Sequence, residues 1–493
     1  MLRGRPRRPA PCVPPVPRMS ERATGHQGHA WRFVPAALAG TYAAAITLAP
    51  KPAVALALGA PLVAIPFAYW AILERDRWLT LFFAAALLLP PLPLALGNTG
   101  PHAALVFVIL GVLAGILNPR GWRVRNEPLN GAFGVFFLVL LGSAAEATFY
   151  SGPAVGLGSL MRVLLFGISV YVFFYAAHGP GSRGTEDVFA QTRLLYWIAV
   201  TSALFACVDF YFQFPAPAGY GAQFVWLRSG VYRRAQGLFY EASTLGNFCA
   251  FFLTMIAAAL LAPRRQAPVS RRGLALGGIV FAAALVLSYS RGSLLNAAVS
   301  IAVLVMLNRQ RIRLGRFFLG LTGTAAAAVL AVRVLLPSFA GAYWMRISTS
   351  LEYLFSETEG LLSGRLASWR TVVGFLAQHP WHAFFGVGYK TLPYSEYLGQ
   401  TVVTDNMYLS LLAETGLVGL GAMLWLSLRI LRSARRAAAA PDAQRRFFGS
   451  WILAFWTGQM VQMFTGDLLT YWRVLPLYFW VLAVAVRHEH SVS

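Results

Sequence analysis

Arginine gathers in three polar stretches that interrupt a very apolar sequence, at 214–242, 288–293 and 337–403. A guanidinium is always charged, and its planar fork of donors matches the geometry of a phosphate. Several converging guanidiniums would therefore bind a diphosphate without a metal ion. Alternatively, each arginine merely reaches lipid headgroups or pairs with a nearby glutamate. The arginines concerned are Arg228, Arg233, Arg234, Arg291, Arg346, Arg365 and Arg370.

Carboxylates at the starts of apolar segments are the candidates for proton transfer. Asp405 and Asn406 open one such segment, where an aspartate serves either as a helix N-cap or as a general base. Glu414 lies about two turns inside it, where a carboxylate is costly and usually functional or paired. Asp209 and Asp467 lie near the ends of other segments. Interface anchoring is the alternative for Asp467, because Tyr471-Trp472-Arg473 follow.

Three other patterns carry no chemistry of their own. Gly386-Val387-Gly388-Tyr389-Lys390-Thr391 superficially suggests a phosphate loop, but its glycine spacing is wrong. His488-Glu489-His490 is too short to indicate a metal site, and His379 and His382 flank a Pro-Trp pair as structural residues would. We therefore expect neither a metal ion nor a cofactor.

The elements that position these residues must be membrane helices. Of 493 residues, 57% are hydrophobic and only 12% are charged, about half the charged fraction of a soluble domain. Apolar stretches of roughly 20 residues recur along the chain, as spanning helices require. We predict an all-α polytopic bundle of about fourteen transmembrane helices. They lie near 33–49, 53–72, 78–96, 102–117, 129–148, 158–177, 194–213, 243–261, 273–289, 293–307, 317–336, 404–428, 447–465 and 473–486.

The net charge of +23 reflects membrane orientation rather than nucleic-acid binding. With the N-terminus inside, most of the 41 lysines and arginines fall on the cytoplasmic side, as the positive-inside rule requires. The three polar stretches then lie outside. The three cysteines, one in the N-terminal tail and two in predicted helices, imply no disulfide framework.

The longest outer stretch is the clearest departure from the hydrophobic rhythm. A helix from Ser363 to about Gln378 is predicted there, ended by His379-Pro380, with Leu366, Trp369, Val373 and Leu376 on one face. We expect it to lie on the bilayer surface. The predicted plan is a disordered basic cytoplasmic tail at 1–32, eleven spans in 33–336, a long periplasmic loop at 337–403, three spans in 404–486 and a cytoplasmic tail at 487–493.

The order of the motifs resembles that of the bacterial O-antigen ligase and polymerase superfamily, over roughly residues 230–430. The motifs that carry the resemblance are Arg234-Ala-Gln-Gly237-Leu-Phe239, Ser288-Tyr-Ser-Arg291-Gly292, Ser363-Gly364-Arg365 with Trp369, His379-Pro380, Gly386-Val-Gly388, Asp405-Asn406-Met-Tyr-Leu409 and Glu414-Thr-Gly416-Leu-Val-Gly419.

The resemblance implies a fold related to the GT-C glycosyltransferases and undecaprenyl-diphosphate-linked glycans as donors, without nucleotide sugar or metal. It implies that Arg234 and Arg365 hold the diphosphate and that Arg291 belongs to the Ser-Arg-Gly turn. Asp467 matches an acidic residue of a late outer segment, and Arg233, Arg370 and Asn406 are supporting residues.

One departure from the ligase pattern concerns the base. Ligases typically place a histidine before the asparagine of the Asn-x-Tyr-Leu segment, where this chain has Asp405. Either Asp405 or Glu414 would take the proton. The substitution and the extra helices favour a polymerase over a ligase.

The predicted function is glycosyl transfer at the outer face of the bacterial inner membrane, polymerising the repeat units of a surface polysaccharide. The alternatives are an O-antigen ligase that transfers glycan to lipid A core, a lipid-linked oligosaccharide flippase and a structural scaffold. The implied partners are the lipid-linked donor, a glycan acceptor and the bilayer, with a chain-length regulator and a flippase as further candidates and no nucleic acid.

Overall fold

The computed structural model describes most of the chain between Lys51 and Arg487. The described residues are 51–73, 76–92, 102–179, 186–215, 221–227, 230–239, 241–263, 267–310 and 365–487, with residues 41–42 and a few positions between 330 and 348. The predicted N-terminal tail at 1–32, the last residues of the predicted C-terminal tail, Arg228 and Arg346 lie outside them.

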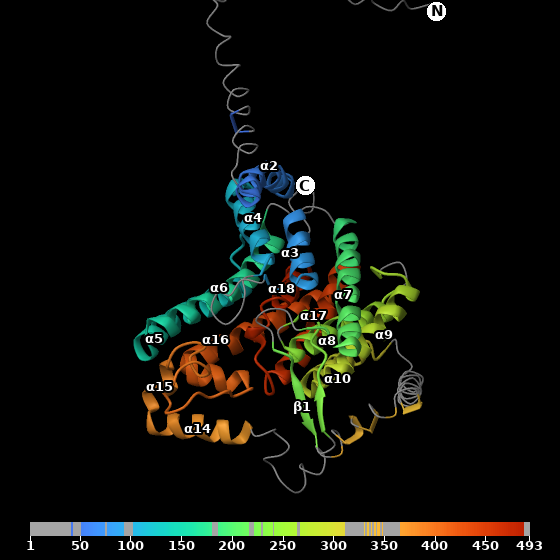
Figure 1. The fold of residues 1–493 in the computed structure, drawn as a ribbon. Coiled ribbons are helices and arrows are strands. Elements are labelled where there is room, and N and C mark those ends of the chain that lie inside the picture. Colours follow the sequence, from blue (N-terminus) through green and yellow to red (C-terminus); the bar gives the residue numbers. More distant parts are fainter. Residues whose placement is uncertain are drawn as a thin grey trace, which may run out of the picture. The chain divides into compact units, whose positions relative to one another are not determined.

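The described elements are helices, apart from one hairpin (Figure 1). The longer helices are α2 (Pro52–Leu73), α3 (Arg77–Leu88), α4 (Ala104–Leu117), α5 (Pro128–Ser151), α6 (Pro153–His178), α7 (Glu186–Phe212), α8 (Ala242–Leu261), α9 (Arg271–Leu287), α10 (Arg291–Leu307), α14 (Arg365–Gln378), α16 (Met407–Ala438), α17 (Ala443–Gln462) and α18 (Leu475–Val486). The short ones are η1 (Pro119–Gly121), α15 (Pro380–Phe385) and η3 (Leu468–Thr470). Residues from Ala71 onward form one compact unit, and α2 belongs mainly to the preceding one.

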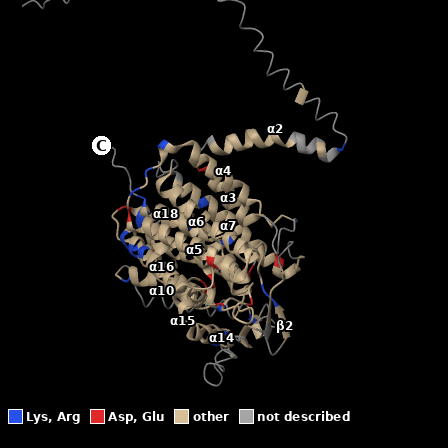
Figure 2. Cartoon of the chain, turned by 90° about the vertical axis from the view of Figure 1, so that its left-hand side faces the viewer, with Lys and Arg blue, Asp and Glu red and all other residues tan. Residues whose placement is uncertain are grey.

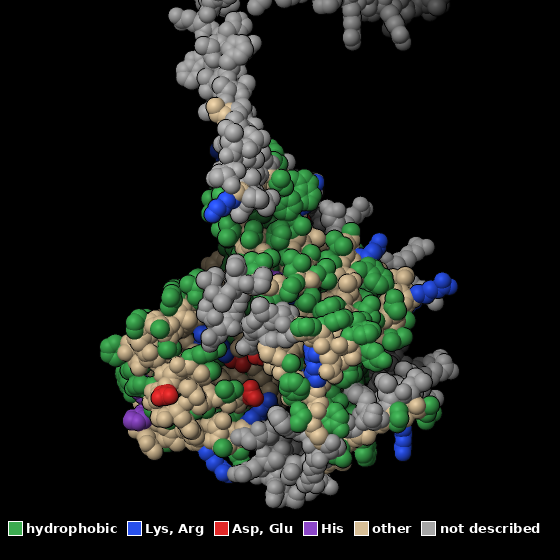
Figure 3. Space-filling view, viewed as in Figure 1, with side chains coloured by type: hydrophobic (Ala, Val, Ile, Leu, Met, Phe, Trp, Pro, Cys, Tyr) green, Lys and Arg blue, Asp and Glu red, His purple; other side chains and the backbone are tan. Residues whose placement is uncertain are grey.

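The chain is an all-α membrane protein. Among the described residues, five helices are long and apolar enough to cross a bilayer: α5, α6, α7 from Val188, α8 and α16. Hydrophobic side chains also cover much of the surface (Figure 3). Each predicted span from 53–72 to 293–307, and from 404–428 onward, coincides with one helix, whereas 33–49 and 317–336 fall mostly outside the described residues. The number of fourteen spans stays a prediction.

The predicted span at 78–96 was too long. Its helix, α3, ends at Leu88. Pro90 and Pro91 follow almost at once, and proline has no N–H with which to continue a helix. The chain leaves the helix there and pairs Pro91 with His102 in an isolated β-bridge.

A network of buried amides joins α8, α10 and α17 inside the bundle. Asn247 of α8 and Asn296 of α10 both donate to the Gln462 side-chain oxygen of α17, at 2.8 and 2.9 Å, and both also bond to Gln459. Gln462 donates onward to Ser293 at 3.0 Å. Polar groups away from water must find partners within the protein, so this network fixes how the three helices meet.

A hairpin of β1 (Phe224–Leu227) and β2 (Gly230–Arg233) precedes α8, and the sequence did not predict it. Arg473, which precedes α18, binds the segment that follows the hairpin. Its guanidinium donates to the carbonyl oxygens of Ala86, Leu89 and Leu238. It thereby holds together the end of α3, the segment after the hairpin and the start of α18.

The loop helix α14 is confirmed over its described residues and ends before His379-Pro380 as predicted. Its predicted apolar face was partly wrong, because Val372 and Leu376 are buried while Val373 is 55% exposed. The helix packs against Leu392, Val402 and Ala413 of the same protein. Its buried face therefore contains Val372 in place of the predicted Val373.

Two glycines allow the backbone of the loop after α15 to contact the backbone of α16 directly. Gly416 interrupts the helical dihedrals of α16 with φ 66°, and Gly386 ends α15 with φ 90°. A Cβ on Gly386 would collide with the Glu414 carbonyl, and one on Gly416 with the Phe384 carbonyl. Only glycine fits such an approach at positive φ.

We predict that the amide network couples α8 to α17 energetically. Asn247→Leu and Gln462→Leu should each lower the free energy of unfolding in detergent by about 1–3 kcal/mol, because each leaves buried partners unsatisfied. A double-mutant cycle should give a coupling of about 1 kcal/mol. Thr457→Val, which removes a bond within α17 only, is the matched control and should show no coupling to Asn247→Leu. A coupling below about 0.3 kcal/mol for Asn247 with Gln462 would contradict the network.

We also predict an acid-sensitive contact at His102. Its Nδ1 accepts from the Ala104 N–H at 3.1 Å and its Nε2 lies 3.0 Å from the Leu89 carbonyl, which together require the neutral ring. Burial, assisted by the Arg473 charge, lowers the pKa of His102 from 6.5 to about 4.

Because the folded state binds the proton more weakly than the unfolded state, this contribution to stability is complete above pH 6.5 and is lost as the pH falls toward 4. By pH 5 the loss amounts to about 2 kcal/mol. Thermal unfolding at pH 7.5 and pH 5 should show a smaller pH effect in His102→Gln than in the wild type. An equal effect in both proteins would rule out this role for His102.

Candidate functional site

The predicted site residues meet at one end of the helix bundle, which we call the site end. It comprises the ends of α7, α9 and α17 and the starts of α8, α10, α16 and α18. Backbone hydrogen bonds join these pieces, from Met407 to Met463 at 2.9 Å and from Ala235 to Leu287 at 2.9 Å. Acidic and basic side chains gather in a hollow on this part of the surface (Figure 3).

Arg365 and Asp405 form an ion pair at the site end. Arg365 Nε donates to Asp405 Oδ2 at 3.1 Å, and the two side chains are 25% and 50% exposed. Nearby, Trp369 of α14 donates its indole N–H to the Thr404 carbonyl at 2.8 Å. α14 is therefore tied at two points to the segment that leads into α16.

Arg234 and Arg291 lie close to this pair. The positive charge of Arg365 acts on both guanidiniums, and the negative charge of Asp405 acts on Arg234. Arg234 Nε donates to the Ser288 carbonyl at 2.9 Å, which aligns it with the turn that precedes Arg291. Burial lowers the pKa of Arg234. Three arginines from distant parts of the sequence thus form one positively charged group.

Asn406, rather than Asp405, caps α16. The Asn406 Oδ1 accepts from the N–H groups of Tyr408 and Leu409 at 3.1 and 3.2 Å. The alternative interpretation of Asp405 as the cap is therefore wrong. Asp405 instead adopts a positive φ of 47°, a conformation uncommon outside glycine, and its carboxylate accepts from Arg365.

Lys390 is the residue whose importance sequence reasoning missed most clearly. Its ammonium pairs with the carboxylate of Asp467 although it is only 6% exposed. Burial alone would lower the pKa of Lys390, but the negative charges of Asp467 and Glu414 outweigh it and raise that pKa. The segment dismissed as a false phosphate loop thus carries a buried cation at the site end.

Glu414 of α16 holds the loop segment that contains Lys390 through hydrogen bonds. Its Oε1 accepts from the Leu392 N–H at 3.3 Å. Its carbonyl accepts from the Gly388 N–H at 2.9 Å and from the Ser143 hydroxyl at 3.0 Å. The carboxylate is only 1% exposed, so the structure shows Glu414 holding the loop.

Arg233, one of the supporting arginines, is paired outside the arginine group. Arg233 pairs with Asp209 at 3.2 Å and also donates to the Phe214 carbonyl, so its charge is already neutralised at the end of α7. Arg370 lies on the exposed side of α14. The pairing of Asp209 follows the rule that buried carboxylates are usually paired.

Glu241 is the second residue that sequence reasoning missed. It immediately precedes α8 and is half-buried, and its Oε2 accepts from the Ser243 hydroxyl at 2.8 Å. Arg234, Asp405, Asp467 and Lys390 are all close enough to act on it electrostatically. A single glutamate before an apolar run gives no periodic signal, so only three-dimensional proximity reveals it.

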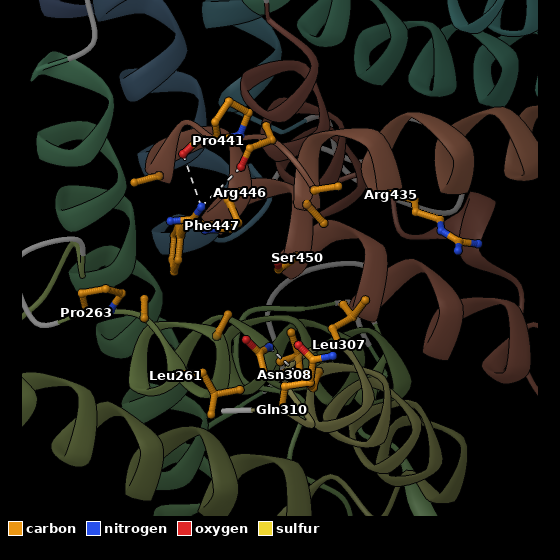
Figure 4. A pocket seen from close by; sticks show the side chains of 17 residues that line it. Leu261, Pro263, Leu307, Asn308, Gln310, Arg435, Pro441, Arg446, Phe447 and Ser450 are labelled. Atoms are coloured by element: carbon orange, nitrogen blue, oxygen red, sulfur yellow. Dashed lines mark hydrogen bonds between the residues drawn. The ribbon is translucent and has the colours of Figure 1, made fainter. Parts of the chain in front are cut away.

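The opposite end of the same helices holds a cavity of about 550 Å³ (Figure 4). It is lined by the ends of α8, α10 and α16 and the start of α17, and none of the predicted site residues lines it. Arg446 in its wall donates to the carbonyl oxygens of Pro441 and Ala440 at 3.3 and 3.4 Å, so it is already engaged. Basic side chains gather around this end of α16 (Figure 2).

Within the described part of the chain, no group of three or more histidine, cysteine, aspartate or glutamate side chains is arranged to hold a metal ion. The arginines and Lys390 are instead the fixed positive charges of the site end.

Comparison with known proteins bears on the middle of the chain. No curated protein matches the sequence. Residues 276–424 match the family model described as O-antigen ligase, a region that contains Arg291, Arg365, Asp405 and Glu414 but neither Arg234 nor Asp467. The match covers somewhat less than a third of the chain, and over it the chain is similar to that family. The predicted resemblance to the O-antigen ligase and polymerase superfamily is thereby confirmed.

Proposed function

We propose that the protein transfers a glycan from an undecaprenyl-diphosphate carrier to a sugar hydroxyl, at the periplasmic face of the bacterial inner membrane. The observation that supports it most is the convergence of Arg234, Arg291 and Arg365 at the site end. Guanidiniums from three distant segments that meet at one place supply the charge-assisted donors with which a diphosphate is bound. Glycosyl transfer of the O-antigen ligase and polymerase type is what the matched family performs.

In this mechanism the three guanidiniums hold the diphosphate and stabilise the charge that builds on it as the glycosidic bond breaks. Fixed cations in a partly dry site are worth more than cations in water, because they need no reorganisation during the reaction. The acceptor hydroxyl attacks the anomeric carbon from the opposite face and inverts it. A carboxylate at the site end takes the hydroxyl proton.

A polymerase is the first choice between the two reactions of the superfamily. Asp405 stands where ligases typically have histidine, and the predicted helix number exceeds that of the ligases. The ligase remains the second candidate because the matched family model is described as O-antigen ligase. Loss of a polymerase leaves single repeats on lipid A core, whereas loss of a ligase leaves polymer on the lipid carrier and none on the core.

A flippase is disfavoured by where the charges lie. A path through both leaflets needs polar groups along its length, but in the described part of the chain the predicted site residues gather at one end. A flippase and a chain-length regulator would instead be partners, supplying outward-facing repeats and setting polymer length. Loss of a flippase would strand the repeats facing inward.

We predict that Arg365→Ala reduces surface polymer at least 100-fold, because it removes a charge that stabilises the leaving diphosphate. Arg365→Lys should retain only part of the activity, since an ammonium keeps the charge but loses the planar fork. The test is complementation of a deletion strain, with gel analysis of surface polysaccharide and extraction of outward-facing lipid-linked repeats, which should accumulate.

The matched control is Arg432→Ala, which removes an exposed arginine at the other end of α16. It should support normal polymer at equal membrane abundance. If Arg365→Ala cells make polymer of normal length and amount, the arginine group does not bind the donor and the proposal fails.

A further inference from the structure

Three carboxylates lie at the site end, and their partners differ. Asp405 is bonded to the Arg365 guanidinium, and Asp467 to the Lys390 ammonium. The Glu241 carboxylate instead accepts from a neutral group, the Ser243 hydroxyl at 2.8 Å. In the described part of the chain, no lysine or arginine forms an ion pair with Glu241. A proton taken by Asp405 or Asp467 would cost an ion pair, whereas one taken by Glu241 would not.

Glu241 is also placed where an acceptor could reach it. Glu241 is half-buried and immediately precedes α8, and its charge interacts with that of Arg234, which places it beside the arginine group. The Ser243 hydroxyl donates to one oxygen of the carboxylate at 2.8 Å, which helps to hold it in position. A base must lie within reach of the proton that it removes and be held in orientation.

We propose that Glu241 is the general base of the transfer reaction and that Asp405 is a positioning residue that orients Arg365. The inference rests on the proposed function and refines it. Glu241 thus takes the role of base that the sequence suggested for Asp405 or Glu414. Glu414 is buried and holds the loop instead.

The reaction step balances without any further reactant. Glu241 removes the proton of the acceptor hydroxyl while that oxygen forms a bond to the anomeric carbon. The bond from this carbon to the diphosphate oxygen breaks, and its electron pair leaves with the undecaprenyl diphosphate. Glu241 returns its proton to water after the products separate, and the diphosphate stays anionic beside the arginines.

The environment of Glu241 raises its pKa, which makes it a stronger base than an ordinary glutamate. Burial raises its pKa; the Ser243 hydrogen bond and the Lys390 charge oppose this, and the charges of Asp405 and Asp467 add to it. Arg234 and Tyr471 are the other titratable groups that face it. Since the deprotonated form is the active one, the turnover rate should rise with pH through a midpoint above the value of about 4.3 usual for glutamate.

The test uses purified full-length protein in vesicles of bacterial polar lipids, with lipid-linked repeats extracted from a deletion strain as donor and acceptor. Glu241→Gln should lower kcat at least 100-fold with the donor KM within about threefold of the wild type, as loss of a general base does. Glu241→Asp should keep part of the activity and shift the pH midpoint. Asp405→Asn should instead raise the donor KM, because it releases Arg365.

Chemical rescue separates a base from a structural residue. Formate, a small carboxylate, should restore activity at least tenfold to Glu241→Ala and leave Asp405→Ala unchanged. Rescue of Asp405→Ala alone, or Glu241→Gln activity within about threefold of the wild type, would overturn the assignment. Equal unfolding temperatures and membrane abundance among the variants check that folding is intact. If the wild-type protein does not elongate the repeats at all, the proposed function itself falls, which is a different result from an active Glu241→Gln.

Discussion

The site depends on the requirement that polar groups buried in a membrane protein be bonded within the protein. Asn247, Asn296 and Gln462 meet this requirement together, and they lie within or at the end of the helices that carry the site residues. Glu241 precedes α8, Arg291 begins α10, and Asp467 follows α17. The amides hold these helix ends in register, so residues far apart in sequence can act on one ligand.

The charged side chains at the site end are also bonded within the protein where they are buried. Asp209 with Arg233, and Asp467 with Lys390, are paired, and they fasten the hairpin and the loop to the bundle. In the group of Arg234, Arg291 and Arg365, the partly exposed Arg365 pairs with Asp405, which is half exposed. The buried pairs therefore build the frame, and under the proposed function the guanidiniums of the group are what a diphosphate would contact.

Much of the fold could be predicted because its signals are local. Apolar runs gave the helices, and His379-Pro380 gave the end of α14. The arginine group followed from charge at the wrong helix ends and from the motif order. Lys390 and Glu241 could not be found in this way, because a buried ion pair and a neutral hydroxyl partner are set by contacts between distant segments. The hairpin was missed for a different reason: its two strands are only four residues each, too short to give a clear alternating pattern.

The close backbone approach between Gly386 and the kink at Gly416 has a consequence for biosynthesis. The loop segment that carries Lys390 is seated on α5 and α16 and is paired with Asp467, which is translated much later. A ribosome that has inserted the chain only as far as α14 has therefore made every arginine of the site but cannot yet dock this segment. Under the proposed function, nascent or truncated chains would therefore be unable to consume the lipid carrier, because the site would be complete only once the last helices have entered the membrane.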